Sequence, residues 1–106
     1  MYFTKEDDFR KLNPFPGIHI LACSGERMTA SILTFEAGSS IPEHAHPHEQ
    51  MGMVLEGTFV LTVEGREKEL RAEDVYVVPP QAPHSARAEA RAKVIDMFSP
   101  RREEYA

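Results

Sequence analysis

Three of the five histidines lie in one short segment, which reads Gly38-Ser39-Ser40-Ile41-Pro42-Glu43-His44-Ala45-His46-Pro47-His48-Glu49-Gln50. On an extended strand His44 and His46 point to the same face, about 6.6 Å apart, so their rings can converge on one ion. Gln50 has the same parity, but a straight strand would carry it about 13 Å from His46. The residues Pro47-His48-Glu49 therefore have to turn the chain, so that Gln50 returns beside the histidine pair on the next strand.

A fourth histidine follows a second segment, Val78-Pro79-Pro80-Gln81-Ala82-Pro83-His84, in which the prolines make a rigid turn. This turn delivers His84 to the start of a new strand. Three neutral imidazoles and one amide oxygen can bind one divalent transition ion and leave positions open for water or substrate. The predicted ligands are therefore His44, His46, Gln50 and His84, and the ion is nickel, zinc, manganese, iron or copper.

Two neighbours of these ligands have other roles to consider. Glu49 competes with Gln50 as a ligand, but the spacing favours Gln50. We expect His48 to lie at the mouth of the site or behind the ligands, because the turn points its side chain away from His46.

Short β-like runs separated by turn residues fill the rest of the chain, which indicates an all-β sandwich or barrel. Glu64-Gly65 has the chemistry of a two-residue hairpin turn. Eight prolines disfavour long helices, and only Glu6–Lys11 is expected to form a short helix or an arm. We read residues 1–106 as one domain, with its core over about residues 28–98 and a polar tail at Arg101–Ala106. The expected strands are Ile18–Ala22, Met28–Phe35, Met51–Leu55, Phe59–Val63, Glu67–Leu70, Val75–Val78 and Lys93–Phe98.

Composition and net charge limit the kinds of partner and compartment that we expect for this protein. The formal net charge of −5 disfavours nucleic acid and anionic membranes, because phosphate contacts need a basic face. The single cysteine, Cys23, has no intrachain partner, which fits a reducing compartment, and it is expected to be a small buried hydrophobe. The N-terminus lacks the features of a signal peptide, and no apolar run reaches the roughly 18 residues of a membrane span. We therefore expect a cytoplasmic protein.

The ligand segment resembles the first motif of the cupin family. The residues that carry this resemblance are Gly38, His44, His46, Gln50 and Gly57, with Gln50 standing where most cupins have glutamate. The resemblance covers roughly Met28 to Phe98. It implies the cupin double-stranded β-helix, a jelly-roll-like antiparallel β-barrel with a metal near one mouth, usually in a homodimer.

The run Glu73-Asp74-Val75-Tyr76-Val77-Val78-Pro79, followed by His84, resembles the second cupin motif. Two of the usual glycines of this motif are replaced, by Glu73 and Gln81, and its asparagine is replaced by Ala88. These departures affect turns and not the ligand. The assignment of His84 to the metal therefore stands.

Within Val94–Phe98, most of the last expected strand, Asp96 is the one polar residue. Val94, Asp96 and Phe98 share one face, and Ile95 and Met97 share the other. Because both faces are otherwise apolar, we expect both to be covered, one of them by a second copy of the chain. Asp96 either pairs with an arginine at the strand end or faces the cavity as an acid and base.

The same segment, together with the three-histidine and glutamine set, resembles the pectin-degradation cupins. Those enzymes linearise 4,5-unsaturated uronates to 5-keto-4-deoxyuronate. The resemblance implies that Asp96, Phe98 and Arg102 complete a site for a small anionic sugar. Asp96 would move the anomeric hydroxyl proton, Arg102 would hold the carboxylate, and Phe98 would pack on the sugar ring.

The amide at Gln50 bears on the chemistry. Replacing a carboxylate removes one negative charge from the ligand set, which favours Lewis-acid work on an anionic ligand over dioxygen chemistry. Two alternatives stay open. One is a small cupin oxygenase that uses iron, manganese or copper, and the other is a non-catalytic module that binds a metal or a sugar.

Overall fold

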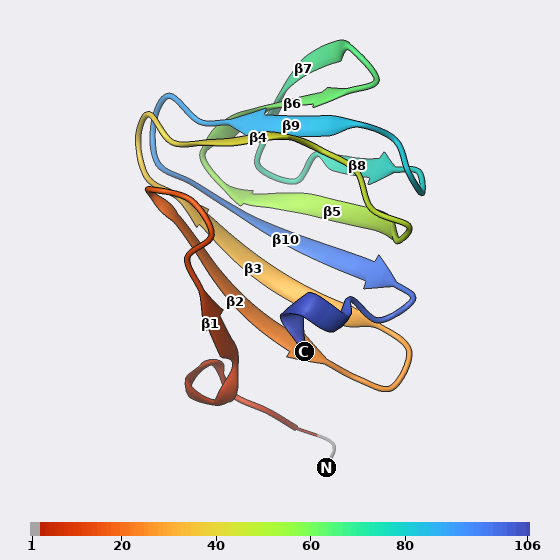
Figure 1. The fold of residues 1–106 in the computed structure, drawn as a ribbon. Coiled ribbons are helices and arrows are strands. Elements are labelled where there is room, and N and C mark those ends of the chain that lie inside the picture. Colours follow the sequence, from red (N-terminus) through yellow and green to blue (C-terminus); the bar gives the residue numbers. More distant parts are fainter. Residues whose placement is uncertain (1–2) are drawn as a thin grey trace.

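The computed structural model describes residues 3–106, which form two antiparallel β-sheets that face each other (Figure 1). The six-stranded sheet has the order β1 (Arg10–Leu12), β2 (Ile18–Ser24), β3 (Thr29–Phe35), β10 (Ala92–Ser99), β5 (Glu49–Glu56) and β8 (Val75–Val78). The four-stranded sheet has the order β4 (Ser40–His44), β9 (His84–Arg87), β6 (Thr58–Val63) and β7 (Arg66–Arg71). Two 3-10 turns, η1 (Glu6–Asp8) and η2 (Glu103–Tyr105), lie near the chain ends. The predicted all-β class is confirmed.

The core lies between the sheets, because alternate residues of each strand point inward. On β3 the buried positions are every second residue from Thr29 to Phe35. Phe35 packs against Phe59 of the other sheet with ring centroids 5.6 Å apart, and Phe59 packs against Tyr76 at 5.5 Å. These aromatic contacts join the two layers around the middle of the sandwich.

Backbone conformation at the turns agrees with most of the turn chemistry. Glu64 and Gly65 both have positive φ, 49° and 78°, as a two-residue hairpin turn of type I′ requires. Glu73 and Gln81 have φ of 77° and 65°, so the turns of the second motif keep the left-handed backbone that the usual glycines would adopt. Gly57 has φ of 75°, and an added Cβ there would lie 2.5 Å from the carbonyl oxygen of Arg91. Gly57 is therefore required by both its backbone and its surroundings.

Three expectations differ from the structure. Residues Glu6–Lys11 are divided between the η1 turn and a short strand, β1, which pairs through its backbone with β2 although two of its three side chains are charged. Cys23 is only half-buried, because it lies near the end of β2 at a position that faces away from the core. The tail at Arg101–Ala106 is not uniformly polar surface, since Arg102 is only 9% exposed.

The two faces of β10 have different surroundings. Asp96 and Phe98 are buried between the sheets, whereas Ile95 is half-buried and Met97 is exposed on the outer face. The expectation that both faces are covered therefore fails within a single chain. Met97 lies in register with Met51 of β5, which lies in register with Val77 of β8, so this outer row is apolar and open.

Candidate metal centre

A bulge in β4 brings two of the histidines together. The four residues of β4 from Ile41 to His44 oppose three residues of β9, and the irregularity falls at Pro42 and Glu43. Proline is tolerated there because β4 is an edge strand, and bulges of this kind re-aim the following side chain. His44 consequently faces inward beside its partner His84, with ring centroids 4.2 Å apart.

Hydrogen bonds fix which nitrogen of each ring carries its proton. The Nδ1 of His44 lies 3.0 Å from the carbonyl oxygen of Pro42, and the Nδ1 of His84 lies 2.9 Å from that of Ala82. A carbonyl oxygen only accepts, so each Nδ1 is the donor and each Nε2 keeps its lone pair. The Nε2 of His84 is buried and has no hydrogen-bond partner.

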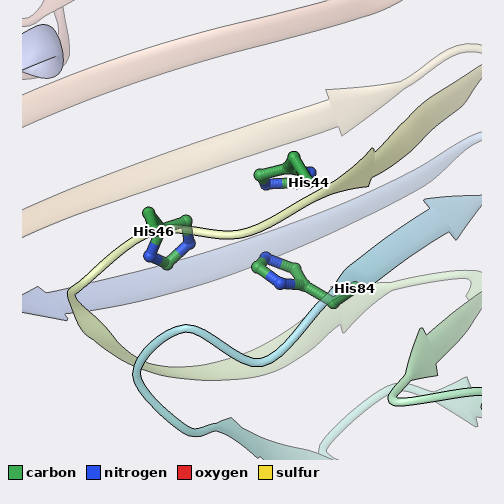
Figure 2. Close-up of side chains that lie close together, drawn as sticks. All are labelled: His44, His46 and His84. Atoms are coloured by element: carbon green, nitrogen blue, oxygen red, sulfur yellow. The ribbon is translucent and has the colours of Figure 1, made fainter.

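His46 lies in the loop after β4 and completes the cluster (Figure 2). One nitrogen from each of His44, His46 and His84 lies within 4.8 Å of the others. Burial, followed by the nearby Arg102 charge, lowers the pKa of His46 to about 4, and burial also lowers the pKa of His84. Both rings are therefore neutral at neutral pH, which is the form that binds metals.

Gln50 returns to the cluster on β5, as the turn at residues 47–49 predicted. Its Oε1 lies 3.1 Å from the Nε2 of His46, and its amide also hydrogen-bonds Asp96. The Gln50 amide thus contacts two residues, His46 through its oxygen and Asp96 through its NH₂ group. A glutamate at this position would place two carboxylates side by side. The position of Asp96 is therefore one reason for a glutamine at residue 50.

Asp96 belongs to a row of residues that crosses three strands. Asp96 of β10 is in register with Gly52 of β5, and Gly52 is in register with Tyr76 of β8. The Tyr76 hydroxyl reaches across the glycine and donates a 2.6 Å hydrogen bond to Asp96. A Cβ at Gly52 would overlap both the Asp96 carboxylate and the Tyr76 phenol. Gly52 therefore makes this hydrogen bond sterically possible.

Burial raises the pKa of Asp96 to about 6, against the opposing effects of the Tyr76 and Gln50 hydrogen bonds and the Arg102 charge. Burial also raises the pKa of Tyr76, so its hydroxyl remains a donor. A carboxyl group with a pKa near neutrality can both take and return a proton. Asp96 thus has the properties of an acid–base group, and it does not pair with an arginine through a direct hydrogen bond.

Arg102 packs against two aromatic rings that meet edge to face. Its guanidinium carbon is 4.8 Å from the centroid of Phe98 and 4.2 Å from that of Tyr105. Its backbone N–H donates to Thr29 at 3.0 Å, which fastens the C-terminal segment to the start of β3. His48 is buried, with its ring centroid 5.2 Å from that of His46, so the expectation that it points away from His46 is wrong. It also lies beside Phe98 and is not part of the three-histidine cluster.

A cavity of about 390 Å³ brings these groups together. Six of the seven site residues predicted from the sequence line it: His44, Gln50, His84, Asp96, Phe98 and Arg102. The seventh, His46, contacts Gln50 and His84 at its edge. Sequence reasoning missed Gly52, Tyr76, Glu104 and Tyr105. A lone glycine inside the β5 pattern is a sign of close approach by another group, and it could have marked Gly52.

Comparison with known proteins identifies the family. Residues 31–98 match the Cupin domain model, so the chain belongs to the cupin family. An RmlC-like cupin from Shewanella frigidimarina NCIMB 400 is 30% identical over 100% of this chain and 96% of its own, with a TM-score of 0.91. KdgF from Halomonas sp. is 30% identical over 100% of this chain and 99% of its own, with a TM-score of 0.89.

More distant structures share the fold alone. Salicylate 1,2-dioxygenase from Pseudoaminobacter salicylatoxidans is 18% identical, over 82% of this chain and 26% of its own, with a TM-score of 0.79. Likeness at this level carries no activity to the chain, so it lends no weight to the oxygenase alternative. Among the described residues, no helix is long and apolar enough to cross a membrane.

Proposed function

We propose that this chain is a single cupin domain and a metal-dependent enzyme that opens the ring of a 4,5-unsaturated uronate to give 5-keto-4-deoxyuronate. The observation that carries the proposal is the buried Asp96 beside Gln50, in one cavity with Arg102 stacked on Phe98. This is the residue set of the pectin-degradation cupins, and the similarity to KdgF supports it.

The four predicted ligands fit a divalent transition ion. The Nε2 of His84 and the Nδ1 of His46 are buried without a hydrogen-bond partner, so both nitrogens are free to bind an ion. A bound divalent ion would polarise oxygens of the sugar as a Lewis acid. Since the three imidazoles and the amide bring no negative charge, the ion would keep its full charge toward an anionic ligand.

Three side chains have separate roles toward the sugar. Arg102 binds the carboxylate, and Phe98 packs against the ring. Asp96 accepts the proton of the anomeric hydroxyl as the bond between C1 and the ring oxygen breaks and C1 becomes an aldehyde. The electron pair of that bond passes to the ring oxygen, which becomes an enolate oxygen on C5, and a proton added at C4 converts this enolate to the C5 ketone. The reaction is an isomerisation without net oxidation.

The test is the ultraviolet absorbance of the C4=C5 enol ether. Incubation of 4,5-unsaturated galacturonate with the protein should speed the loss of this absorbance over its spontaneous decay. Asp96→Asn should keep the metal but lose about 10²–10⁴-fold in rate, because it removes the acid–base group. Asp8→Asn, an exposed aspartate on η1, is the matched control and should leave the rate unchanged.

Arg102→Ala should mainly raise KM, because a carboxylate clamp binds ground and transition states alike. If the parent protein accelerates neither the galacturonate- nor the guluronate-derived sugar, the uronate proposal is wrong. A metal-loaded Asp96→Asn protein with full activity would reduce Asp96 to a structural role.

We also propose that the chain works as a homodimer in the cytoplasm. Exposed apolar residues gather on the outer face of β5, β8 and β10, and such a face is stabilised when a second copy covers it. They are Met51, Leu55, Val75, Val77 and Met97. Light scattering at micromolar concentration should give twice the mass of the chain, and a monomer would contradict the proposal.

A further inference from the structure

The C-terminal segment folds back over the cavity. Arg101 donates to the carbonyl oxygen of Gly25 at 3.1 Å, and the backbone N–H of Arg102 donates to Thr29 at 3.0 Å. The η2 turn then begins at Glu103, and its residues Glu104 and Tyr105 line the cavity. In Figure 1 the dark blue η2 turn lies against β2. The last turn of the chain is therefore part of the cavity wall.

Glu104 places a carboxylate on the cation of the proposed clamp. Its Oε2 lies 3.4 Å from the Nε of Arg102, whose side chain is only 10% exposed. The Glu104 side chain is itself 58% exposed. The rings of Phe98 and Tyr105, which meet edge to face, both pack against the Arg102 guanidinium, and Glu104 is the anion that lies at its Nε.

A second carboxylate, that of Asp96, also interacts electrostatically with Arg102, but a ligand cannot displace it. Asp96 is buried and accepts from Tyr76 and Gln50 within the sheet. Glu104, by contrast, has an exposed side chain on a three-residue turn and is held by its ion pair with the Nε of Arg102. Of these two carboxylates, only Glu104 can leave without disturbing the sheet.

We propose that Glu104 is an internal competitor for the anion position at Arg102, so that a carboxylate-bearing ligand binds by displacing it. This inference rests on the proposed function only in using Arg102 as the carboxylate clamp. Displacement replaces one carboxylate with another at the guanidinium, whereas a neutral ligand that displaced Glu104 would leave the cation unpaired. Glu104 therefore lowers the affinity of the clamp for anionic ligands, whereas a neutral sugar binds in the cavity without displacing it.

The expected effect is modest, because an exposed ion pair contributes about 0.2–1 kcal/mol. Glu104→Gln should therefore tighten binding of D-galacturonate, a saturated uronate that cannot undergo the ring opening described above, by about two- to five-fold. Glu103→Gln is the matched control, since Glu103 is adjacent and pairs with Arg101 instead. Isothermal titration calorimetry of the full chain with its metal measures both.

D-galactose separates competition from a general change in the cavity. Its affinity should be the same in the parent and in Glu104→Gln, because it carries no carboxylate. Unchanged galacturonate affinity in Glu104→Gln, equal tightening in Glu103→Gln, or equal tightening toward galactose would each overturn the inference. Absence of galacturonate binding in every variant would overturn it too.

Turnover provides an independent readout that distinguishes the two proposals. If the uronate is linearised, Glu104→Gln should lower KM and leave kcat unchanged. If no uronate is linearised but Glu104→Gln still binds galacturonate more tightly, the competitor role stands and the proposed reaction fails. Linearisation with an unchanged KM in Glu104→Gln would leave the reaction standing and reject the competitor role.

Discussion

Strand β10 crosses the interior, and its first half has apolar neighbours whereas its second half has the neighbours of the candidate site. At the start of the strand Ala92 is in register with Phe35, which is in register with Ile18, and all three are fully buried and apolar. Four residues later Asp96 stands between Ser31 on one neighbouring strand and Gly52 on the other. Alternate side chains of β10 therefore pack in the core around Ala92, which we call the apolar end, and line the candidate site around Asp96, which we call the site end.

The two ends differ in how well their polar atoms are satisfied. The hydroxyl of Ser31, the Nδ1 of His46 and the Nε2 of His84 are buried without partners, and all belong to the site end. Buried polar atoms without partners cost stability, so this end weakens the fold that the apolar end supports. We infer that the apolar end stabilises the protein and that the unpartnered polar atoms of the site end lower its net stability.

The largest expected effect is on the apolar end. Phe35→Ala removes a fully buried ring that joins the two sheets, and it should lower the free energy of unfolding by about 3–5 kcal/mol. Urea unfolding measures this loss, with Leu55→Ala on the outer face as the control that should lose much less. If both variants lose equally, the apolar end has no special part in stability.

The next effect belongs to the site end and should spare the fold. His84→Ala removes one of four predicted ligands, and it should weaken metal binding by more than the about 10–100-fold typical of losing a supporting contact. Elemental analysis after dialysis gives the occupancy, and His19→Ala, outside the cluster, should retain about one ion per chain. Full occupancy in His84→Ala would reject the ligand assignment.

A third effect is the pH dependence of stability without metal. The pKa of Asp96 is raised to about 6, so the stability it contributes is present below its unfolded pKa and lost as pH rises through 6. The pKa of His46 is lowered to about 4, so its contribution is present above its unfolded pKa and lost as pH falls through 4. Between these values the two slopes oppose each other.

Single variants should expose the two slopes separately. Relative to the parent, the free energy of unfolding of Asp96→Asn should rise with pH by about 1.4 kcal/mol per unit between pH 4 and 6. His46→Asn should change in the opposite direction. Urea titrations across this range, with a chelator present, measure both, and parallel curves for all three proteins would contradict the pKa shifts.

The smallest effect concerns the turns that flank the site. Glu73 and Gln81 hold φ values that favour glycine, so Glu73→Gly and Gln81→Gly should each stabilise the protein by up to about 1 kcal/mol. Glu69→Gly, in the middle of β7, is the control and should destabilise it. A loss of stability in all three variants would show that the left-handed backbone at residues 73 and 81 carries no cost.

The apolar end was largely predictable from the sequence, and the site end only in its ligands. Strands such as β3 and β10 follow from alternation, and the return of Gln50 follows from chain length alone. The contact between Asp96 and Tyr76 depends on the register of three strands far apart in the chain, which no local pattern contains. The inward position of Arg102 depends on aromatic packing at the chain end, where the local composition is polar.

The position of the tyrosines has an optical consequence. The chain contains no tryptophan and three tyrosines, of which Tyr2 lies outside the described residues and Tyr76 and Tyr105 both line the cavity. The Tyr76 phenol donates to a carboxylate and the Tyr105 ring lies under a guanidinium, and both surroundings affect tyrosine emission. A ligand that reorganises Asp96 or Arg102 therefore changes the intrinsic fluorescence, so occupancy of the cavity can be followed without a label.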